Sequence, residues 1–243
     1  MYPGLVFLIA LLIVAVMYSS VGHGGASGYL ALMSIFAVST VYFRSSALIL
    51  NLFVAGIAFV NFRSGYKIRW RLFLPFILPS IPMAFIGAMI HINSGTYKII
   101  LGILLFVALL RLMYHPSHEY KIKSPPAIIL SLVIGSVLGL ISGMIGIGGG
   151  IILSPILILM RWAGVKETGV YSSLFILLNS LAGLSGLGFD NILLPPGFYY
   201  WILVVAAGGL IGSMTTMKYL PVKYFKFSLV LVLLFACFRL LIY

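Results

Sequence analysis

The sequence predicts an all-α integral membrane protein in which about ten transmembrane or re-entrant helical segments form two inverted five-segment repeats. Three observations carry this prediction: the composition, landmarks that recur in the second half of the chain, and an uneven distribution of basic residues between alternate loops. Of the 243 residues, 63% are hydrophobic and only 7% are charged. This balance leaves too little polar surface for a soluble domain and excludes a soluble enzyme.

The apolar residues gather in runs with short connections between them. A spanning helix needs roughly 20 apolar residues, so the runs account for most of the chain. The most polar stretch lies between the fifth and sixth runs, and we expect a first repeat over residues 1–113, a linker over 114–126 and a second repeat over 127–243. The runs cover residues 4–20, 26–42, 45–62, 72–91, 96–113, 127–145, 150–162, 168–187, 198–217 and 224–242.

Several landmarks of the first half recur in the second half at a shift of about 124 to 128 residues, as a duplicated unit would leave them. Their order is the same in both halves, and chance is a poor explanation for so many matches. The matched sets are Gly22, Gly24 and Gly25 with Gly146, Gly148 and Gly149; Ser45 and Ser46 with Ser172 and Ser173; Asn51 with Asn179; and Gly87 and Met89 with Gly212 and Met214.

Five segments per repeat is an odd number, so the second repeat must enter the membrane from the opposite side. The basic residues agree with this parity: 12 of the 15 lie on one predicted face, and only Arg44, Lys98 and Arg239 lie on the other. Because basic loops stay in the cytoplasm, we expect a multi-pass protein of a bacterial-type inner membrane, with a cytoplasmic linker and both termini outside. The competing interpretation is a bundle in which one segment is miscounted.

Two glycine clusters, at residues 22–28 and 146–150, interrupt apolar stretches at equivalent places in the two halves. Consecutive glycines are poor helix formers and permit positive backbone dihedrals, so each cluster predicts a broken hairpin whose second arm begins at the glycines. In the second half only about a dozen residues separate Gly150 from Arg161, too few for an easy crossing. Whether the hairpins are re-entrant or fully spanning stays open.

The start of each second arm would expose unpaired N–H groups and the positive end of a helix dipole, which suits an oxyanion. Irregular backbone at membrane depth is tolerated only inside protein or beside a water-filled cavity, and two inverted copies can face each other near the midplane. The pattern therefore predicts an anion site between the halves. The alternative is that the glycines merely allow close helix packing.

Polar residues within the apolar runs complete the candidate site. His23 could donate a hydrogen bond to substrate or carry a coupled proton, or it could be a buried neutral histidine bonded to a carbonyl. Asn51 and Asn179 could line the path or hold helices together. The full set of candidate substrate-binding residues is Gly22, His23, Gly24, Gly25, Ser27, Gly28, Asn51, Gly146, Gly148, Gly149, Gly150, Ser154 and Asn179.

The motifs around both clusters resemble those of the sulfite exporter TauE/SafE family of membrane transporters. The strings that carry the likeness are SVGHGGASGYLAL from Ser20 to Leu32, SGMIGIGGGIILSP from Ser142 to Pro155 and SSLFILLNSLAG from Ser172 to Gly183. The resemblance covers nearly the whole chain. It implies two packed repeats that export or take up sulfite, organosulfonates or related small sulfur-containing anions. Our own hypothesis is a secondary carrier that works by alternating access between the inverted repeats.

Missing residue types narrow the function further. The three acidic residues, Glu119, Glu167 and Asp190, fall in loops or at a segment edge, so no intramembrane carboxylate is available for a cation. No catalytic or metal-binding motif is present, and the scattered basic residues favour a lipid bilayer over nucleic acid as the partner. We expect no enzyme activity, cofactor or metal.

The rival hypotheses are a membrane-embedded enzyme with His23 as its base and a non-transporting scaffold or receptor. The coupling ion, a proton or sodium, the transport direction and assembly as a homo-oligomer cannot be read from the residues.

Overall fold

A computed structural model describes residues 4–216 of the chain, apart from positions 94, 98, 101, 104, 105, 107–109 and 111–121. The predicted tenth segment, the first part of the linker, and two of the three basic residues expected outside, Lys98 and Arg239, lie outside the described residues. Among the described residues every regular element is a helix, which confirms the prediction of an all-α chain.

The helices follow the predicted runs in order. In the first half they are α1 (Leu5–Ser19), α2 (Ala26–Ile35), the short 3-10 helix η1 (Thr40–Tyr42), α3 (Phe43–Arg63) and α4 (Trp70–Met89). The described residues between 95 and 110 are also helical. In the second half they are α6 (Ile128–Ile145), α7 (Gly150–Leu159), α8 (Val165–Leu187), η2 (Phe189–Asn191) and α9 (Phe198–Thr216).

Four helical spans within the described part of the chain are long and apolar enough to cross a membrane: Thr40–Arg63, Trp70–Met89, Ile128–Ile145 and Glu167–Leu187. Three further apolar segments are shorter: Leu5–Ser19, Ala26–Ile35 and the part of α9 over Phe198–Met214. The described helices therefore fit a multi-pass membrane protein. The predicted total of about ten segments stays a prediction.

The second arms of the two hairpins are short. Helices α2 and α7 each contain ten residues, about 15 Å of helix, which is half of a hydrocarbon core of roughly 30 Å. The shortness of α7 agrees with the sequence, whereas the run predicted over residues 26–42 is divided by a turn after α2.

Both short helices end in the same way, at a non-glycine residue with positive φ. Ala37 has φ 55° and Arg161 has φ 60°. In each case the N–H of the next residue bonds back to the carbonyl five positions earlier, from Val38 N to Met33 O at 2.9 Å and from Trp162 N to Leu157 O at 2.8 Å. This is the Schellman arrangement. Glycine normally occupies that position, so neither ending is signalled by its residue type.

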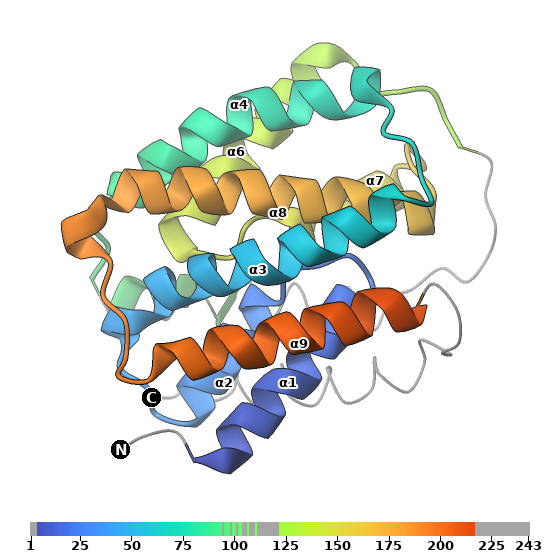
Figure 1. Ribbon diagram of the computed structural model, residues 1–243. Helices are drawn as coiled ribbons and strands as arrows, with labels where there is room; N and C mark the ends of the chain where they lie inside the picture. Colours follow the sequence, from blue (N-terminus) through green and yellow to red (C-terminus); the bar gives the residue numbers. More distant parts are fainter. Residues whose placement is uncertain are drawn as a thin grey trace.

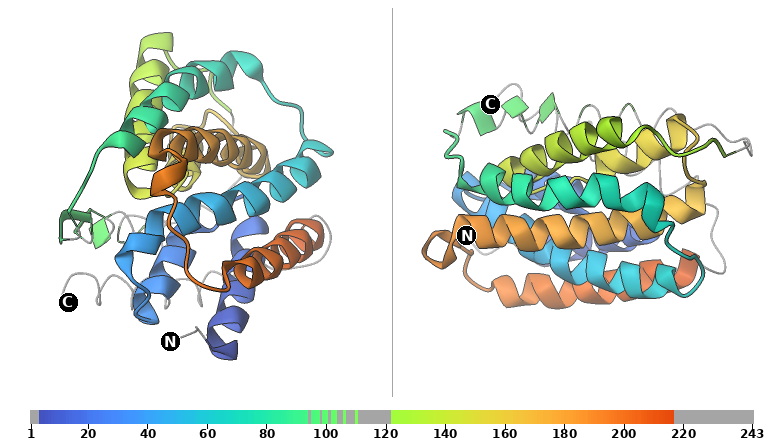
Figure 2. Two further views of the ribbon diagram at one scale, coloured as in Figure 1. Left: turned by 60° about the vertical axis from the view of Figure 1, so that its left-hand side comes forward. Right: turned by 90° about the horizontal axis from the view of Figure 1, so that it is seen from above.

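The helices form a layered bundle whose order is α6, α4, α8, α3, α9, α1 (Figures 1 and 2). Helices α3 and α8 lie side by side at the centre, and α2 and α7 pack against α3 and α8 respectively. When each helix is exchanged for its predicted counterpart, α1 with α6, α3 with α8 and α4 with α9, the order reads the same from the other end. A pair of repeats related by a two-fold axis predicts this arrangement.

The central helices α3 and α8 run antiparallel. Leu48 near the start of α3 faces Gly183 near the end of α8, Gly56 faces Leu177, and Phe62 at the end of α3 faces Gly169 near the start of α8. Because these helices are predicted counterparts, their opposed directions are those expected of inverted repeats.

The outer pairs, α4 with α6 and α9 with α1, run parallel and pack through glycine. Successive glycines of α6 lie against backbone carbonyls of α4, and a Cβ added to Gly139 would stand 2.2 Å from the Ser80 carbonyl oxygen. The contacts are Gly135 with Phe76, Gly139 with Ser80 and Gly143 with Ala84, and then Gly208 with Leu12 and Gly212 with Val16. Small residues at four-residue spacing bring membrane helices close together in this way.

Helix α4 contains three internal prolines, Pro75, Pro79 and Pro82. Proline has no backbone N–H, so the carbonyls four residues earlier, at Arg71, Pro75 and Leu78, lack their usual helical partner. The ladder of hydrogen bonds in α4 is therefore weaker than in an uninterrupted helix of the same length.

Candidate functional site

The two glycine clusters form turns that begin α2 and α7. Five of their glycines adopt positive φ: Gly22 at 77°, Gly25 at 93°, Gly146 at 88°, Gly148 at 78° and Gly149 at 72°. Residues with a side chain rarely adopt this region, so the predicted break in each hairpin is confirmed. The chain turns sharply at both places and then starts a new helix.

The two turns meet at Asn51 of α3 and Ile176 of α8. A Cβ on Gly24 would lie 2.4 Å from Asn51 Oδ1, and one on Gly148 would lie 2.9 Å from Asn51 Nδ2; both would also touch Ile176 Cγ2. Asn51 Nδ2 donates to the carbonyl of Ile147 at 3.3 Å. Glycine is therefore required at positions 24 and 148 for close approach, and the predicted Asn51 joins the halves at this point.

Each turn also reaches the first turns of the long central helix of the other half. Gly22 lies against the backbone of Gly169 in α8, and Gly146 lies against Arg44 in α3. The two clusters are thus placed in equivalent surroundings, as the repeat predicts.

A buried chain of polar side chains links His23 to the second half. His23, 5% exposed, bonds through Nδ1 to the carbonyl of Val21 at 3.0 Å and through Nε2 to Ser154 Oγ at 3.1 Å. Ser154 is in turn hydrogen-bonded to Ser172. A carbonyl only accepts, so Nδ1 carries a proton, and in the neutral tautomer Nε2 accepts from the Ser154 hydroxyl.

Five predicted residues contact their own half instead. Ser27 bonds to Tyr18 of α1 at 2.6 Å, and Gly28 packs against Val14 and Tyr18. Asn179 donates to the Phe175 carbonyl of its own helix at 2.8 Å. Gly149 and Gly150 lie against Phe175 and Ile176 of α8.

Five buried polar atoms have no hydrogen-bond partner among the described residues, and three of them, Tyr29 Oη, Asn51 Oδ1 and Ser142 Oγ, belong to residues that contact the turns. The other two are Ser46 Oγ and Asn179 Oδ1. Tyr29 Oη lies beside Gly25, and Ser142 lies beside Gly149. Unpaired buried polar groups are rare because each costs about 1–3 kcal/mol. Their concentration here indicates a place where water or a polar ligand completes the bonding.

A cavity of about 510 Å³ lies at one end of the bundle, which we call the Arg44 cavity. Its walls come from η1, α3, the ends of α4 and α6, and the end of α8; they include Thr40, Arg44, Ile92, Tyr97, Met144 and Leu187. None of the thirteen candidate residues lines it, although Gly146 lies against its Arg44. The cavity therefore adjoins the second glycine turn without including it.

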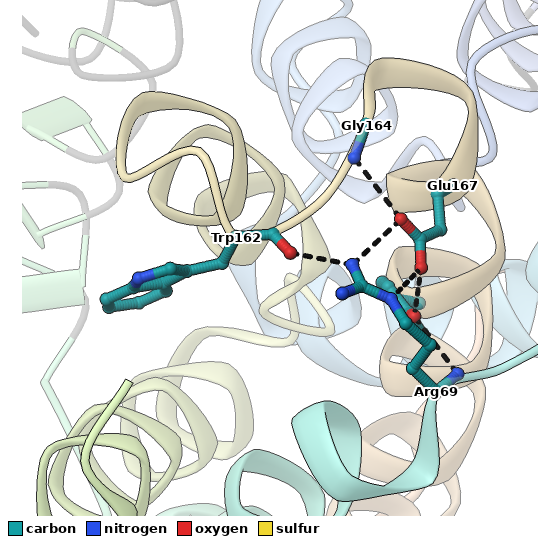
Figure 3. A network of polar contacts seen from close by, with 5 residues as sticks. Arg69, Trp162, Gly164 and Glu167 are labelled. Carbon is teal, nitrogen blue, oxygen red and sulfur yellow. Dashed lines mark hydrogen bonds and ion pairs between the residues drawn. The ribbon is translucent and has the colours of Figure 1, made fainter. Parts of the chain in front are cut away.

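A second polar cluster, the Arg69–Glu167 network, lies at the opposite end of the bundle, at the starts of α4 and α8; Figure 3 shows its contacts. Arg69 Nε donates to Glu167 Oε1 at 2.6 Å and Arg69 Nη2 to Oε2 at 2.9 Å, while Nη2 also donates to the carbonyl of Trp162 at 2.6 Å. Tyr171 donates to Glu167 Oε1 and accepts from the Arg69 backbone, and Gly164 N donates to Glu167 Oε2. The bond to Glu167 raises the pKa of the Arg69 guanidinium and so stabilises its charged form.

This network ties the start of α4, in the first half, to the α7–α8 connection and the start of α8, in the second half. The Arg44 cavity lies at the other ends of the same two helices, at Met89 and Leu187. Both helices span 20 or more residues, about 30 Å, so the cavity and the network stand a membrane thickness apart with the glycine turns between them.

The sequence prediction missed these charged residues. A usable signal was present for Arg44, one of only three basic residues on the sparsely basic face, and for Glu167, one of three acidic residues in the chain. Each has a partner in the other half of the chain, 99 residues away for Arg44 and 98 for Glu167, and no local spacing marks these pairs.

A bundle of apolar helices with broken hairpins and polar groups buried between its halves defines a polytopic α-helical membrane protein. The chain belongs to the sulfite exporter TauE/SafE family, whose model matches residues 6–240. It is 31% identical over 238 residues to the probable membrane transporter protein y4hK of Sinorhizobium fredii (strain NBRC 101917 / NGR234), and the alignment covers 96% of each chain. No solved structure matches the chain. The protein is a membrane transporter, and the family resemblance of its motifs is confirmed.

Proposed function

We propose that this protein is a secondary transporter that carries a small anion, sulfite, an organosulfonate or a related sulfur-containing anion, by alternating access between two inverted repeats. The repeats are residues 1–113 and 127–243, joined by a cytoplasmic linker over 114–126. The substrate class follows from the description of the family as sulfite exporters and from the predicted absence of a carboxylate inside the apolar runs.

The observation that carries the proposal is the meeting of two uncapped helix starts at the centre of the bundle. Helices α2 and α7 begin directly after Gly25 and Gly149, and neither has a side-chain N-cap. The first residues of α2 are buried, with Ala26 2% and Ser27 1% exposed. A buried helix start without a cap leaves N–H donors in need of an acceptor, and this applies to the start of α2, whereas in α7 Gly150 N and Ile152 N already donate to the carbonyls of Gly148 and Gly149. An oxyanion is favoured at the positive end of both helix dipoles.

Alternating access is supported by the contrast between the two ends of the bundle. A cavity opens at the Arg44 end, and an ion pair with three further hydrogen-bond partners joins the two halves at the Arg69 end. On this proposal, the described conformation corresponds to a carrier accessible from the Arg44 end. By the distribution of basic residues that end faces outward.

The test is anion flux into proteoliposomes that contain the purified protein. We expect uptake of radiolabelled sulfite or a short alkanesulfonate, and a loss of at least about tenfold in rate on Gly24→Ala, whose methyl group would overlap Asn51 Oδ1. Gly56→Ala in α3 is the matched control, since its nearest neighbour would be 3.7 Å away. If Gly24→Ala fails to fold, Asn51→Ser removes the amide without adding volume and serves in its place.

If liposomes that contain correctly folded protein transport none of the sulfur oxyanions, the proposed function is wrong. A Gly24→Ala protein that transports at the wild-type rate would remove the glycine turns from the path, because no substrate site at their contact could accommodate the methyl group.

A further inference from the structure

Arg44 is a half-buried cation whose side chain bridges the ends of two helices. Its Nε donates to the carbonyl of Gly143 at 2.9 Å, Nη2 to Gly87 at 2.9 Å and Nη1 to Ile90 at 3.4 Å. These carbonyls belong to the last turns of α6 and α4, where the helix dipole favours a positive charge. Three of the five guanidinium N–H groups are used in this way, so two remain for a ligand.

The charge of Arg44 is not balanced by a carboxylate within the described part of the chain. Its three hydrogen-bond partners are neutral carbonyls, and no acidic residue lines the Arg44 cavity. Asp190 is exposed and next to the lining residue Asn191, but it does not itself line the cavity. A guanidinium in a recess with fixed carbonyl bonds is held ready for a planar or tetrahedral oxyanion, which it can bind through two parallel N–H groups.

The volume and the lining of the cavity indicate the size and polarity of the ligand, whereas the Arg44 charge indicates only that it is an anion. A volume of about 510 Å³ lies within the range of roughly 300–1,000 Å³ that is typical of sites for organic ligands. Besides Arg44, most of the wall is apolar and includes Ile92, Met144 and Leu187. A bare inorganic oxyanion would leave this apolar surface unused, whereas an anion with a short hydrocarbon body would cover it.

We infer that the Arg44 cavity binds a small organic anion, with its sulfonate or carboxylate head on the Arg44 guanidinium and its apolar body against Ile92, Met144 and Leu187. This site is separate from the glycine turns and lies on the way to them, because Gly146 is packed against Arg44. The inference rests on the proposed transport function and deepens it by naming the form of substrate that the open end receives.

The test is calorimetric titration of the protein in phosphatidylcholine nanodiscs with methanesulfonate, propanesulfonate, butanoate and propylammonium. Propanesulfonate is expected to bind more tightly than methanesulfonate, by about fourfold for each methylene that becomes buried, and propylammonium is expected not to bind. The comparison of propanesulfonate with butanoate, which have matched bodies, identifies the preferred head group.

Arg44→Gln is expected to raise the Kd of propanesulfonate at least about tenfold, the usual effect of losing a charge-assisted hydrogen-bond pair, while Arg44→Lys retains part of the affinity. Arg63→Gln, at the exposed far end of α3, is the matched control and should leave the Kd unchanged. Because Arg44 also holds helix ends, a second variant leaves it in place: Met89→Glu puts a carboxylate beside the cavity from an exposed position and should weaken binding severalfold, whereas Met89→Gln should not.

Wild-type affinity in both Arg44→Gln and Met89→Glu would overturn the inference, as would equal binding of propylammonium. Equal affinity for methanesulfonate and propanesulfonate would contradict the role of the apolar wall. Flux in liposomes together with an unchanged Kd in Arg44→Gln would refute this site and leave the transport function standing. If propanesulfonate binding depends on Arg44 but no flux is detected, the site is supported and the proposed transport function is refuted.

Discussion

Replacing Glu167 by glutamine removes the carboxylate at the centre of the Arg69–Glu167 network while keeping the size of the side chain. The change breaks the ion pair and two charge-assisted bonds from Arg69, and it weakens the bonds from Tyr171 and Gly164. Because this network joins the first half to the second at one end of the bundle, we expect the variant to open that end more often.

The size of the effect follows from the geometry and exposure of the pair. A charge-assisted hydrogen bond contributes about 1.5–3 kcal/mol when buried, but the Arg69 side chain is 39% exposed and that of Glu167 is 15% exposed, so solvent screening reduces the value. We expect about 1–2 kcal/mol in favour of the open state, which multiplies its population by about 5 to 30.

The assay is the labelling rate of a cysteine placed behind the network. Cys237 is the single native cysteine and is first changed to serine; Ala163→Cys then introduces a thiol at a fully buried position next to Trp162. In nanodiscs, where both faces meet the solvent, a maleimide should label Glu167→Gln about 5 to 30 times faster than the parent. The double variant Arg69→Gln with Glu167→Gln should label no faster than either single variant, because the two residues act as one unit.

Arg71→Gln is the matched control, since Arg71 is an exposed cation two residues from Arg69 and outside the network. A labelling rate for Glu167→Gln within twofold of the parent would refute the reasoning. So would an equal acceleration by Arg71→Gln, which would show that net charge rather than the specific pair controls the opening.

Two further substitutions test packing and buried polarity by thermal unfolding. Gly139→Val should lower stability by about 1–3 kcal/mol, because even a Cβ would stand 2.2 Å from the Ser80 carbonyl oxygen. Gly56→Ala should leave stability unchanged. An unchanged melting temperature for Gly139→Val would show that α4 and α6 separate easily. Ser154→Ala should lower the free energy of unfolding by about 1–3 kcal/mol, because it removes the hydroxyl bonded to His23 Nε2. Ser136→Ala, at an exposed hydroxyl bonded within α6, should lower it less. Equal losses of stability in the two variants would show that the buried hydrogen bonds of His23, Ser154 and Ser172 contribute no more than an exposed one.

Hydropathy predicts most of the fold because the bilayer requires long apolar helices. It overextends α2, since Phe36, Ala37 and Val38 are as apolar as the helix before them and contain no glycine or proline. The turn there depends on positive φ at Ala37 and on a bond from Val38 to Met33, which are backbone features that the residue types do not signal.

The candidate site is predictable where its signal is local. Glycine clusters mark the turns, and an asparagine within an apolar run marks Asn51. The ends of the bundle are not predictable in this way, because Arg44 and Arg69 act through carbonyls and a carboxylate supplied by distant segments. Basic residues near membrane helices usually report orientation alone, and only the three-dimensional contacts distinguish these two from the others.

The three prolines of α4 have a mechanical consequence. This helix carries Arg69 at its beginning and the Arg44-bound carbonyls of Gly87 and Ile90 at and just beyond its end. With three backbone bonds missing between those anchors, α4 can flex about its middle at lower energetic cost than a continuous helix. The contacts of Arg69 can therefore break while those of Arg44 remain, because α4 can bend at its prolines between the two.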